Sequence, residues 1–354
     1  MSGFVLLASA AGPTQNVSIF DPASPSTEAI RNLSYLIFAI TGVIFIIVEG
    51  VLFYSIIRFR RKAGDGTAEP PQVYGSKPIE IAWTVAPALI VLIIVLVVTR
   101  TLWDVNRDQP EPKPGDNALF VTVIGRQWWW EYSYDYYNNQ KLGFITANEL
   151  HIPASDDGTP RPTYLTLKSA DVCHSFWVPR LAGKTDLIPG RTNHMWLQTS
   201  ERGLFVGQCA EYCGTQHANM LLRVVVESPK DFEDWLENEK KPAREDPAVA
   251  DGKTAFLAHS CVNCHRVRGS PAQGTYAPDL THLMSRKTLA SGIIANDPDH
   301  LRQWIGGPQK KEFAGEEVRI YPGPQKIKPG CLMPDFGLSA RELDLVVSYL
   351  QTLR

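Results

Sequence analysis

The segment GQCAEYCGTQHANM, residues 207–220, holds the side chains that most restrict the fold and chemistry of this chain of 354 residues. Four of them are Cys209, Cys213, His217 and Met220, with three, three and two residues between successive members. One loop can therefore bring together two thiolates, an imidazole and a thioether. Thiolate and thioether sulfurs select a soft metal, imidazole suits copper, and a weak methionine ligand is typical of electron-transfer copper sites. The segment therefore predicts a copper centre. A Cys209–Cys213 disulfide and a zinc site are the alternatives, and the spacing alone leaves open whether one or two copper ions bind.

Short β-strand patterns surround this loop. From about Ala118 to Val226, runs rich in β-branched and aromatic residues alternate with clusters of Pro, Gly, Asp and Asn, for example ALFVTVIG, YLTLK, HSFWV, HMWLQ and MLLRVVVE. The pattern predicts a β-sandwich or barrel, to which we assign residues 104–228. His174, at the end of a predicted strand, can supply a second imidazole to the copper centre from across the sandwich.

A second cofactor motif follows. Residues 261–265 read Cys-Val-Asn-Cys-His, the c-type heme attachment pattern, in which two thiols bond the vinyl groups and the histidine reaches the iron. The predicted heme ligands are therefore Cys261, Cys264 and His265. A redox Cys-x-x-Cys pair and half of a zinc site are the alternatives, but no second cysteine pair follows downstream and no βαβ pattern surrounds the motif.

A six-coordinate heme needs a second axial ligand, and methionine paired with histidine raises the reduction potential. Met333 lies in KPGCLMPDFG, a loop rich in Gly and Pro before the final helical pattern, and is the predicted ligand. Met284 follows a helix-like run and is interpreted as core packing. Helical patterns and irregular loops beyond Gly252, ending in a helix that Ser339 can cap, predict a small all-α domain at residues 251–354.

The segment between the two predicted domains is charged. Residues 229–250 begin with a short amphipathic helical pattern and continue through a stretch that contains Pro242 and Pro247. We interpret this segment as a helix and an interdomain linker.

Two long apolar runs precede the β-rich region. Residues 34–57 contain one charge and residues 81–99 contain none, and a spanning helix needs about 20 mostly apolar residues. Neither run has a polar stripe, which disfavours the alternative of a buried helix pair in a soluble protein. The runs predict a transmembrane hairpin at residues 33–103.

The loop between these runs sets the predicted orientation. It carries the basic cluster Arg58, Arg60, Arg61 and Lys62, which the positive-inside rule places in the cytoplasm. The segment 1–32 and everything after Trp103 are then expected outside the cytoplasm. The N-terminal MSGFVLLASAAG has an Ala-x-Ala pattern at Ala8–Ala10 but no basic start, which disfavours a cleaved signal peptide.

Composition excludes two further classes. The formal net charge of −2 argues against a nucleic-acid binder, which would show a one-sided basic excess. Six cysteines at uneven spacings are too few for a disulfide scaffold in a chain of this size. We interpret two of them, Cys173 and Cys331, as small buried hydrophobic side chains.

Three segments together resemble a known family. The segments GRQWWWEYSYDY (125–136), DVCHSFWVPRLAGKTDLIPGR (171–191) and the copper loop look like the Greek-key cupredoxin domain of cytochrome c oxidase subunit II. The order of heme motif, Met-Pro loop and closing helix resembles a class I cytochrome c. The chain is therefore similar to the caa-type oxidases, in which subunit II is fused to cytochrome c.

The resemblance implies a ligand set. The copper centre would be the binuclear copper A site, bridged by both cysteines of the loop, with two terminal histidines, a weak methionine and a backbone carbonyl: Cys209, Cys213, His174, His217, Met220 and Glu211. The same family uses the side chain of this glutamate on a magnesium ion at the interface with subunit I.

Two further residues match family positions. Trp128 corresponds to the tryptophan through which electrons enter the copper site, and it is assigned to the surface that faces the heme. Glu80 corresponds to the glutamate at the entrance of a proton pathway. The other aromatic residues of the 128–137 run are interpreted as core and interface packing.

The resemblance also implies a function and partners. Electrons would pass from a donor, a cytochrome c or an upstream respiratory complex, through heme c and copper A to subunit I, which contains heme and copper B, reduces oxygen to water and pumps protons. Subunit III would be a further partner. The setting would be a bacterial inner membrane, in contact with lipid and not with nucleic acid, with both termini on the periplasmic or outer side. This chain would hold no oxygen-reducing site, because both cofactors have full protein ligand sets.

Two alternatives remain beside this function. The first is a membrane-tethered electron carrier or copper-handling protein that serves another partner. The second is subunit II of a quinol oxidase, which shares the fold but lacks the copper ligands.

Overall fold

The computed structural model describes residues 17–61, 64, 69, 72, 74–107, 117–244, 246–306 and 322–354. They form two compact units: one lies within Glu28–Pro110, and the other combines the residues up to Thr27 with those from Glu111 onward. The sequence features at Ala8–Ala10 and Lys62 lie outside the described residues.

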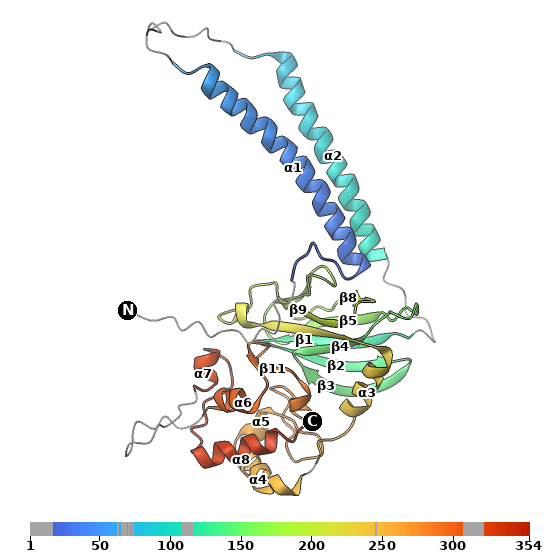
Figure 1. Ribbon diagram of the computed structural model, residues 1–354, viewed down its shortest axis with the longest axis vertical. Helices are drawn as coiled ribbons and strands as arrows, with labels where there is room; N and C mark the ends of the chain where they lie inside the picture. Colours follow the sequence, from blue (N-terminus) through green and yellow to red (C-terminus); the bar gives the residue numbers. More distant parts are fainter. Residues whose placement is uncertain are drawn as a thin grey trace. The chain divides into compact units, whose positions relative to one another are not determined.

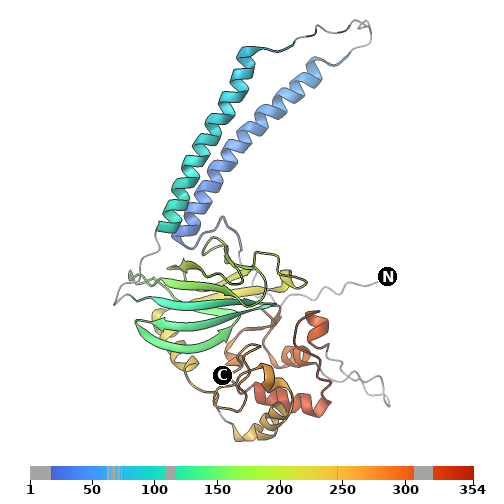
Figure 2. The ribbon, with the colours of Figure 1, turned by 180° about the vertical axis from the view of Figure 1, so that it is seen from behind.

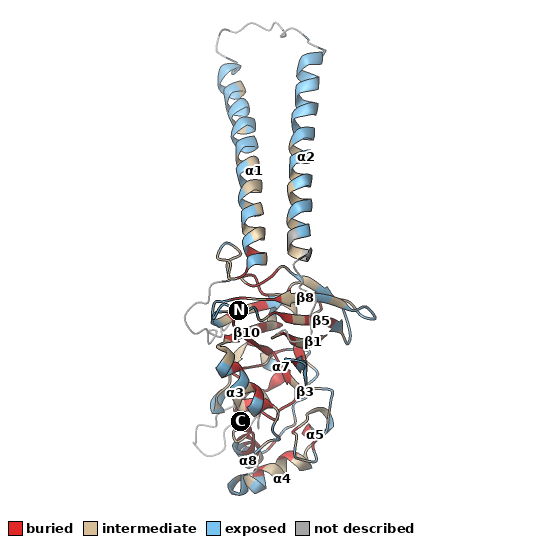
Figure 3. Ribbon diagram, turned by 90° about the vertical axis from the view of Figure 1, so that its right-hand side faces the viewer, coloured by how far each residue is buried: buried red, intermediate tan, exposed pale blue. Residues whose placement is uncertain are grey.

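The first unit consists of two long apolar helices, α1 (Pro25–Arg58) and α2 (Lys77–Arg107). Both are long and apolar enough to cross a membrane, and neither buries its apolar stretch against the rest of the chain. Figure 3 shows their surfaces as mostly exposed. Exposed apolar helices of this length fit a lipid environment, because a helix satisfies all its backbone hydrogen bonds internally. The alternative of a buried helix pair is therefore wrong for the described residues.

The second unit contains two five-stranded sheets (Figure 1). The first sheet has the order β3-β2-β1-β5-β8, with bounds β1 (Leu119–Arg126), β2 (Trp129–Tyr137), β3 (Gln140–Ala147), β5 (Thr163–Ser169) and β8 (Asn193–Leu197). The second has the order β4-β10-β9-β6-β7, with bounds β4 (Glu149–Pro153), β6 (His174–Trp177), β7 (Thr185–Leu187), β9 (Gly203–Cys209) and β10 (Leu221–Glu227). The chain crosses between the sheets several times, which confirms the predicted sandwich.

The core of the sandwich follows from strand alternation. Alternate residues of β1 and β10 are buried, as expected when successive side chains point to opposite faces. Helix α3 (Pro229–Glu239) covers the sandwich with Phe232 and Leu236, and the side chain of Ser228 caps its first turn. The predicted amphipathic helix is thus part of the sandwich's packing.

The rest of the second unit is a small helical domain, drawn in orange and red in Figures 1 and 2. Its helices are α4 (Ala250–Ala258), α5 (Cys261–Cys264), α6 (Pro298–Ile305), α7 (Pro324–Ile327) and α8 (Ala340–Leu350). The hairpin of β11 (Thr288–Leu289) and β12 (Ile294–Ala295) and two short 3₁₀ turns, η2 (Pro247–Val249) and η3 (Leu283–Ser285), lie beside them. A third 3₁₀ turn, η1 (His217–Asn219), belongs to the sandwich, between β9 and β10. Ser339 and Glu342 form a capping box at the start of α8, as the sequence predicted.

One cysteine prediction is wrong. Cys173 is exposed, whereas the sequence analysis placed it in the interior. It directly precedes His174, which is fully buried at the start of β6. Neighbouring side chains at a strand end point in opposite directions, so burying the histidine turns the cysteine outward. Cys331 is half-buried and lines a pocket of the helical domain.

Candidate metal and heme centres

The predicted copper ligands converge at one end of the sandwich. Cys209 ends β9, His217 opens η1, and His174 opens β6 in the same sheet as β9. The Sγ atoms of Cys209 and Cys213 are 3.8 Å apart. Cys209 Sγ lies 3.9 Å from His174 Nδ1, and Cys213 Sγ lies 3.6 Å from His217 Nδ1. Met220 Sδ completes the group at 3.8 Å from Cys213 Sγ.

Backbone pairing holds this group together. The amide of Cys209 donates to the carbonyl of Met220 at 3.0 Å, and β6 pairs with β9 so that Phe176 faces Cys209. Gly125 on β1 lies directly beneath the histidine, because a Cβ there would approach the Cδ2 atom of His174 to 2.7 Å. The sheet of β9 and β10 therefore fixes both ends of the ligand loop, and β1 of the other sheet packs against His174.

A carboxylate orients the buried histidine. His174 Nε2 donates a 2.7 Å hydrogen bond to Asp171 Oδ1, which leaves Nδ1 directed at the sulfur of Cys209. Burial lowers the pKa of His174, but hydrogen bonds with Asp171 and Cys209 outweigh it and the net shift is upward. An outer carboxylate that fixes the tautomer of a histidine is typical of metal ligands. The sequence analysis missed Asp171, although its position three residues before His174 was a signal.

The two loop thiols lie in direct contact. A hydrogen bond from Cys213 lowers the pKa of the Cys209 thiol, and the same contact raises the pKa of Cys213. One thiolate is therefore favoured without a metal, and a bound metal would have to displace the second proton. The 3.8 Å sulfur separation is far longer than the roughly 2.05 Å of a disulfide bond. These two soft, buried sulfurs with two imidazoles and a thioether fit copper better than zinc, which rarely takes a methionine ligand.

Glu211 contributes its backbone to this site. Its carbonyl oxygen lies 3.2 Å from Cys209 Sγ, whereas its side chain is exposed. The position of the carbonyl fits the predicted backbone ligand.

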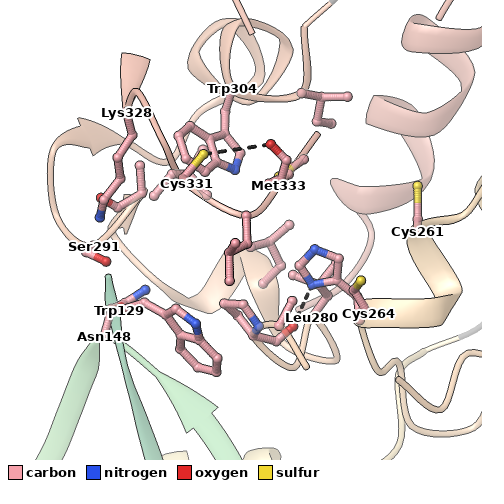
Figure 4. A pocket seen from close by; sticks show the side chains of 18 of the residues that line it. Trp129, Asn148, Cys261, Cys264, Leu280, Ser291, Trp304, Lys328, Cys331 and Met333 are labelled. Atoms are coloured by element: carbon pink, nitrogen blue, oxygen red, sulfur yellow. Dashed lines mark hydrogen bonds between the residues drawn. The ribbon is translucent and has the colours of Figure 1, made fainter. Parts of the chain in front are cut away.

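The predicted heme residues line a common pocket. It encloses about 1170 Å³ including its open mouth, and its walls include Cys261, Cys264, His265 and Met333. Figure 4 shows the attachment cysteines on one side of the pocket and Lys328, Ser291 and Trp129 on the other. Met284 does not line it and packs against the domain core, as predicted.

Two polar groups fit a heme in this pocket. His265 Nδ1 donates a 2.8 Å hydrogen bond to the carbonyl of Pro278, which leaves Nε2 available to an iron. Burial lowers the pKa of His265, which favours the neutral imidazole that binds metals. Arg286 is a buried cation whose Nε has no hydrogen-bond partner among the described residues. The carboxylates of a bound heme would supply the missing partner.

Trp128 lies between the loop of the predicted copper ligands and the pocket of the predicted heme residues. It lies in the turn between β1 and β2 and lines the heme pocket. Its indole Nε1 donates a 3.0 Å hydrogen bond to the carbonyl of Cys213 in the copper loop. Glu80, in contrast, lies in the first turn of α2, in the other unit.

Comparisons with known proteins match each of the three parts of this architecture. Residues 13–99 match the family model described as cytochrome c oxidase subunit II, transmembrane domain, and residues 119–228 match its periplasmic domain. Residues 249–354 match the cytochrome c family model. Fold and site together thus define a membrane-bound electron-transfer subunit with a copper domain and a c-type heme domain.

Similar proteins show the family. The chain is 32% identical to cytochrome c oxidase subunit 2 of Alkalihalophilus pseudofirmus over 96% of its own length and 92% of that protein. It is also 32% identical to the same subunit of Bacillus subtilis, over 86% of its length and 87% of that protein. The crystal structure of the periplasmic domain of subunit II from Bradyrhizobium japonicum is 32% identical, covers 36% of this chain and 96% of that one, and has a TM-score of 0.31. The chain belongs to the cytochrome c oxidase subunit II family, in a form that carries a C-terminal cytochrome c domain.

Family membership decides the broad function. The chain is a component of an oxidoreductase complex and the subunit through which electrons enter it. The copper and cytochrome c domains imply copper A and heme c as cofactors. The alternatives of an independent carrier and a quinol oxidase subunit are set aside.

Proposed function

We propose that this chain carries electrons from an external donor through heme c and copper A to subunit I of an oxidase that reduces oxygen and pumps protons. The observation that carries the proposal is the position of Trp128, which lines the heme pocket and hydrogen-bonds the copper loop at Cys213. The proposed setting is a bacterial inner membrane, with the soluble domains on the periplasmic or outer side and subunit III in the same complex. The donor is a cytochrome c or an upstream respiratory complex.

The heme end uses four side chains of the helical domain. Cys261 and Cys264 attach the heme, His265 binds its iron through Nε2, and Met333 binds from the facing loop. Arg286 supports the proposal because it offers a buried positive charge to the heme carboxylates. The protein excludes water from the pocket through apolar walls such as Leu283, Leu301 and Trp304.

The copper end uses residues from β6, from β9 and from the loop between β9 and β10, all in one sheet. Cys209 and Cys213 are the proposed bridging ligands, with His174 and His217 as terminal ligands and Met220 and the Glu211 carbonyl as weak ones. Two copper ions held by these residues would supply a centre that accepts and passes on one electron. Asp171 holds the ring of His174 in place through its hydrogen bond to Nε2, with Nδ1 left for the copper.

Two roles are proposed at the edges of the chain. The exposed side chain of Glu211 binds a magnesium ion at the contact with subunit I, since it is free to turn away from the copper loop while its carbonyl stays in place. Glu80, at the start of α2, lies at the entrance of a proton pathway. The proposed domain limits are 1–32, 33–103, 104–228, 229–250 and 251–354.

The test uses the oxidase complex purified with this chain at full length. We expect two copper ions assignable to this subunit, a covalent heme c band, and an electron paramagnetic resonance signal split by two equivalent copper nuclei. The signal should disappear in Cys213→Ser while the heme band remains. A heme band without any such signal after copper loading would contradict the copper assignment.

A further inference from the structure

The copper domain and the heme domain exchange buried polar side chains across their contact. Glu149 reaches from the sandwich to backbone of the helical domain, and Lys328 reaches from the helical domain to backbone of the sandwich. Both are almost fully buried, at 2% and 3% exposed. We call this pair the interdomain clamp.

Glu149 binds the start of the β11 hairpin. Its carboxylate accepts hydrogen bonds from the Lys287 amide at 2.9 Å, the Thr288 amide at 2.9 Å and the Thr288 hydroxyl at 2.7 Å. A buried carboxylate must find donors, and here the helical domain supplies several of them. The hydrogen bonds of the Glu149 carboxylate, at the first residue of β4, thus come from the heme domain.

Lys328 binds two carbonyls of the copper domain. Its Nζ donates to the carbonyl of Trp128 at 2.6 Å and to that of Asn219 at 3.0 Å, with Ala290 of its own domain at 3.3 Å. Burial lowers the pKa of this amine to about 7. Both protonation states can donate to the two copper-domain carbonyls, so the clamp does not depend on the charge.

Further hydrogen bonds join the copper domain and the heme domain at the same contact. Ser291 Oγ donates to the Trp128 carbonyl at 2.6 Å, and Gln216 Nε2 donates to the carbonyl of Pro329 at 2.7 Å. Arg223 on β10 donates to the carbonyl of Gly292 at 3.1 Å. A side chain at Gly292 would collide with that guanidinium, because a Cβ would lie 2.0 Å from its Nη1.

These contacts differ from those of transient redox partners. Transient partners meet through exposed charges that steer encounter and weaken with salt. Here Glu149 and Lys328 are buried and paired with backbone of the other domain. Lys328 and Ser291 also both donate to the carbonyl of Trp128. Backbone atoms are fixed in direction, so such contacts specify one pose.

We propose that Glu149 and Lys328 are positioning residues that hold the heme domain in one fixed pose on the copper domain, so that electron transfer between heme c and copper A involves no docking step. This rests on the proposed function, which supplies the two cofactors. As a consequence, an external donor delivers its electron to the heme domain, because that domain covers the turn that holds Trp128.

The first test measures hydrogen exchange in the purified full-length oxidase. Amides in the peptides that contain Trp128, Thr288 and Ser291 should be protected in the parent protein. Glu149→Gln and Lys328→Met should each speed their exchange about 10- to 100-fold, since each removes hydrogen bonds to a buried polar group. Matched controls are Glu233→Gln and Lys326→Met, both exposed positions, and they should leave these peptides unchanged.

The second test follows heme c oxidation after flash photoreduction in the same samples. In the parent oxidase the rate should not change with ionic strength or with added glycerol. The two clamp variants should show a slower phase whose rate falls as viscosity rises, with the heme band and the copper signal intact.

The outcomes distinguish a failure of the proposed function from a failure of the fixed pose of the heme domain. A parent sample without a heme c band or copper signal would overturn the proposed function. Intact cofactors with a viscosity-dependent parent rate would overturn the fixed pose alone. Intact cofactors with control-like exchange in both clamp variants would overturn the role of Glu149 and Lys328.

Discussion

The indole Nε1 of Trp128 donates a 3.0 Å hydrogen bond to the backbone carbonyl of Cys213, and the same side chain lines the pocket that contains the heme-attachment motif. One side chain therefore joins the environments of both predicted cofactors. The first of the following predictions tests this arrangement, and the others test the copper ligands, the heme ligand and the closing helix.

Replacing Trp128 should slow transfer between the two cofactors. Trp128→Phe removes the hydrogen bond to Cys213 and part of the aromatic contact, and we expect the heme c to copper A rate to fall about tenfold or more, as is common when a reacting pair loses its positioning. Flash photoreduction measures the rate. Tyr136→Phe, an exposed position on β2, is the control and should leave the rate unchanged.

Removing the carboxylate behind His174 should weaken copper binding. Asp171→Asn keeps the size of the side chain but loses the negative charge that orients the ring, and outer partners of this kind are worth about 10- to 100-fold in metal affinity. Competition with a copper chelator measures the change. Equal copper retention in Asp171→Asn and in the exposed control Asp186→Asn would count against this role.

Met333 and Met284 should behave differently on substitution. Met333→Leu removes the predicted axial sulfur from the heme pocket, so the heme should become high-spin and its reduction potential should fall. Met284→Leu is nearly volume-conserving in the core and should leave the spectrum and potential unchanged. A redox titration with optical detection distinguishes them, and the reverse pattern would assign the ligand to Met284.

The closing helix should depend on its cap. Ser339→Ala removes the hydroxyl that accepts the Glu342 amide in the capping box, which should cost about 0.5–2 kcal/mol of stability. Thermal unfolding followed at the heme band reports the loss. Ser348→Ala, late in the same helix on an exposed position, should have a smaller effect.

Local patterns explain how much of the fold was predictable. The apolar runs, the alternating strands and the cap at Ser339 are set by neighbouring residues, so the sequence reveals them directly. The two helices extend beyond the predicted runs, to Pro25 and to Arg107, because helices continue through polar residues after the apolar stretch ends. Strands β3 and β4 lacked a distinct signal in the sequence analysis.

The sites show the same division. The heme motif and the copper loop are each one short continuous segment, so the sequence reveals them. Asp171, Arg286 and Glu149 instead act through residues or groups that lie near them only in the folded protein. Lys328 is the clearest case. Its segment, GPQKIKPG, has a proline and a glycine at each end, a pattern typical of a solvated loop. In the structure Lys328 is buried against the turn of Trp128, 200 positions earlier in the chain. The outward turn of Cys173 likewise follows from the inward turn of its neighbour His174.

The most direct test of the account follows both cofactors at once after flash reduction of heme c in the purified oxidase. Heme c oxidation, read at its visible band, and copper A reduction, read at its near-infrared band, should proceed at the same rate and with matching amplitudes. Substituting Trp128 should slow both together. Oxidation of heme c without any change at the copper band would contradict the proposed path from the helical domain to the sandwich.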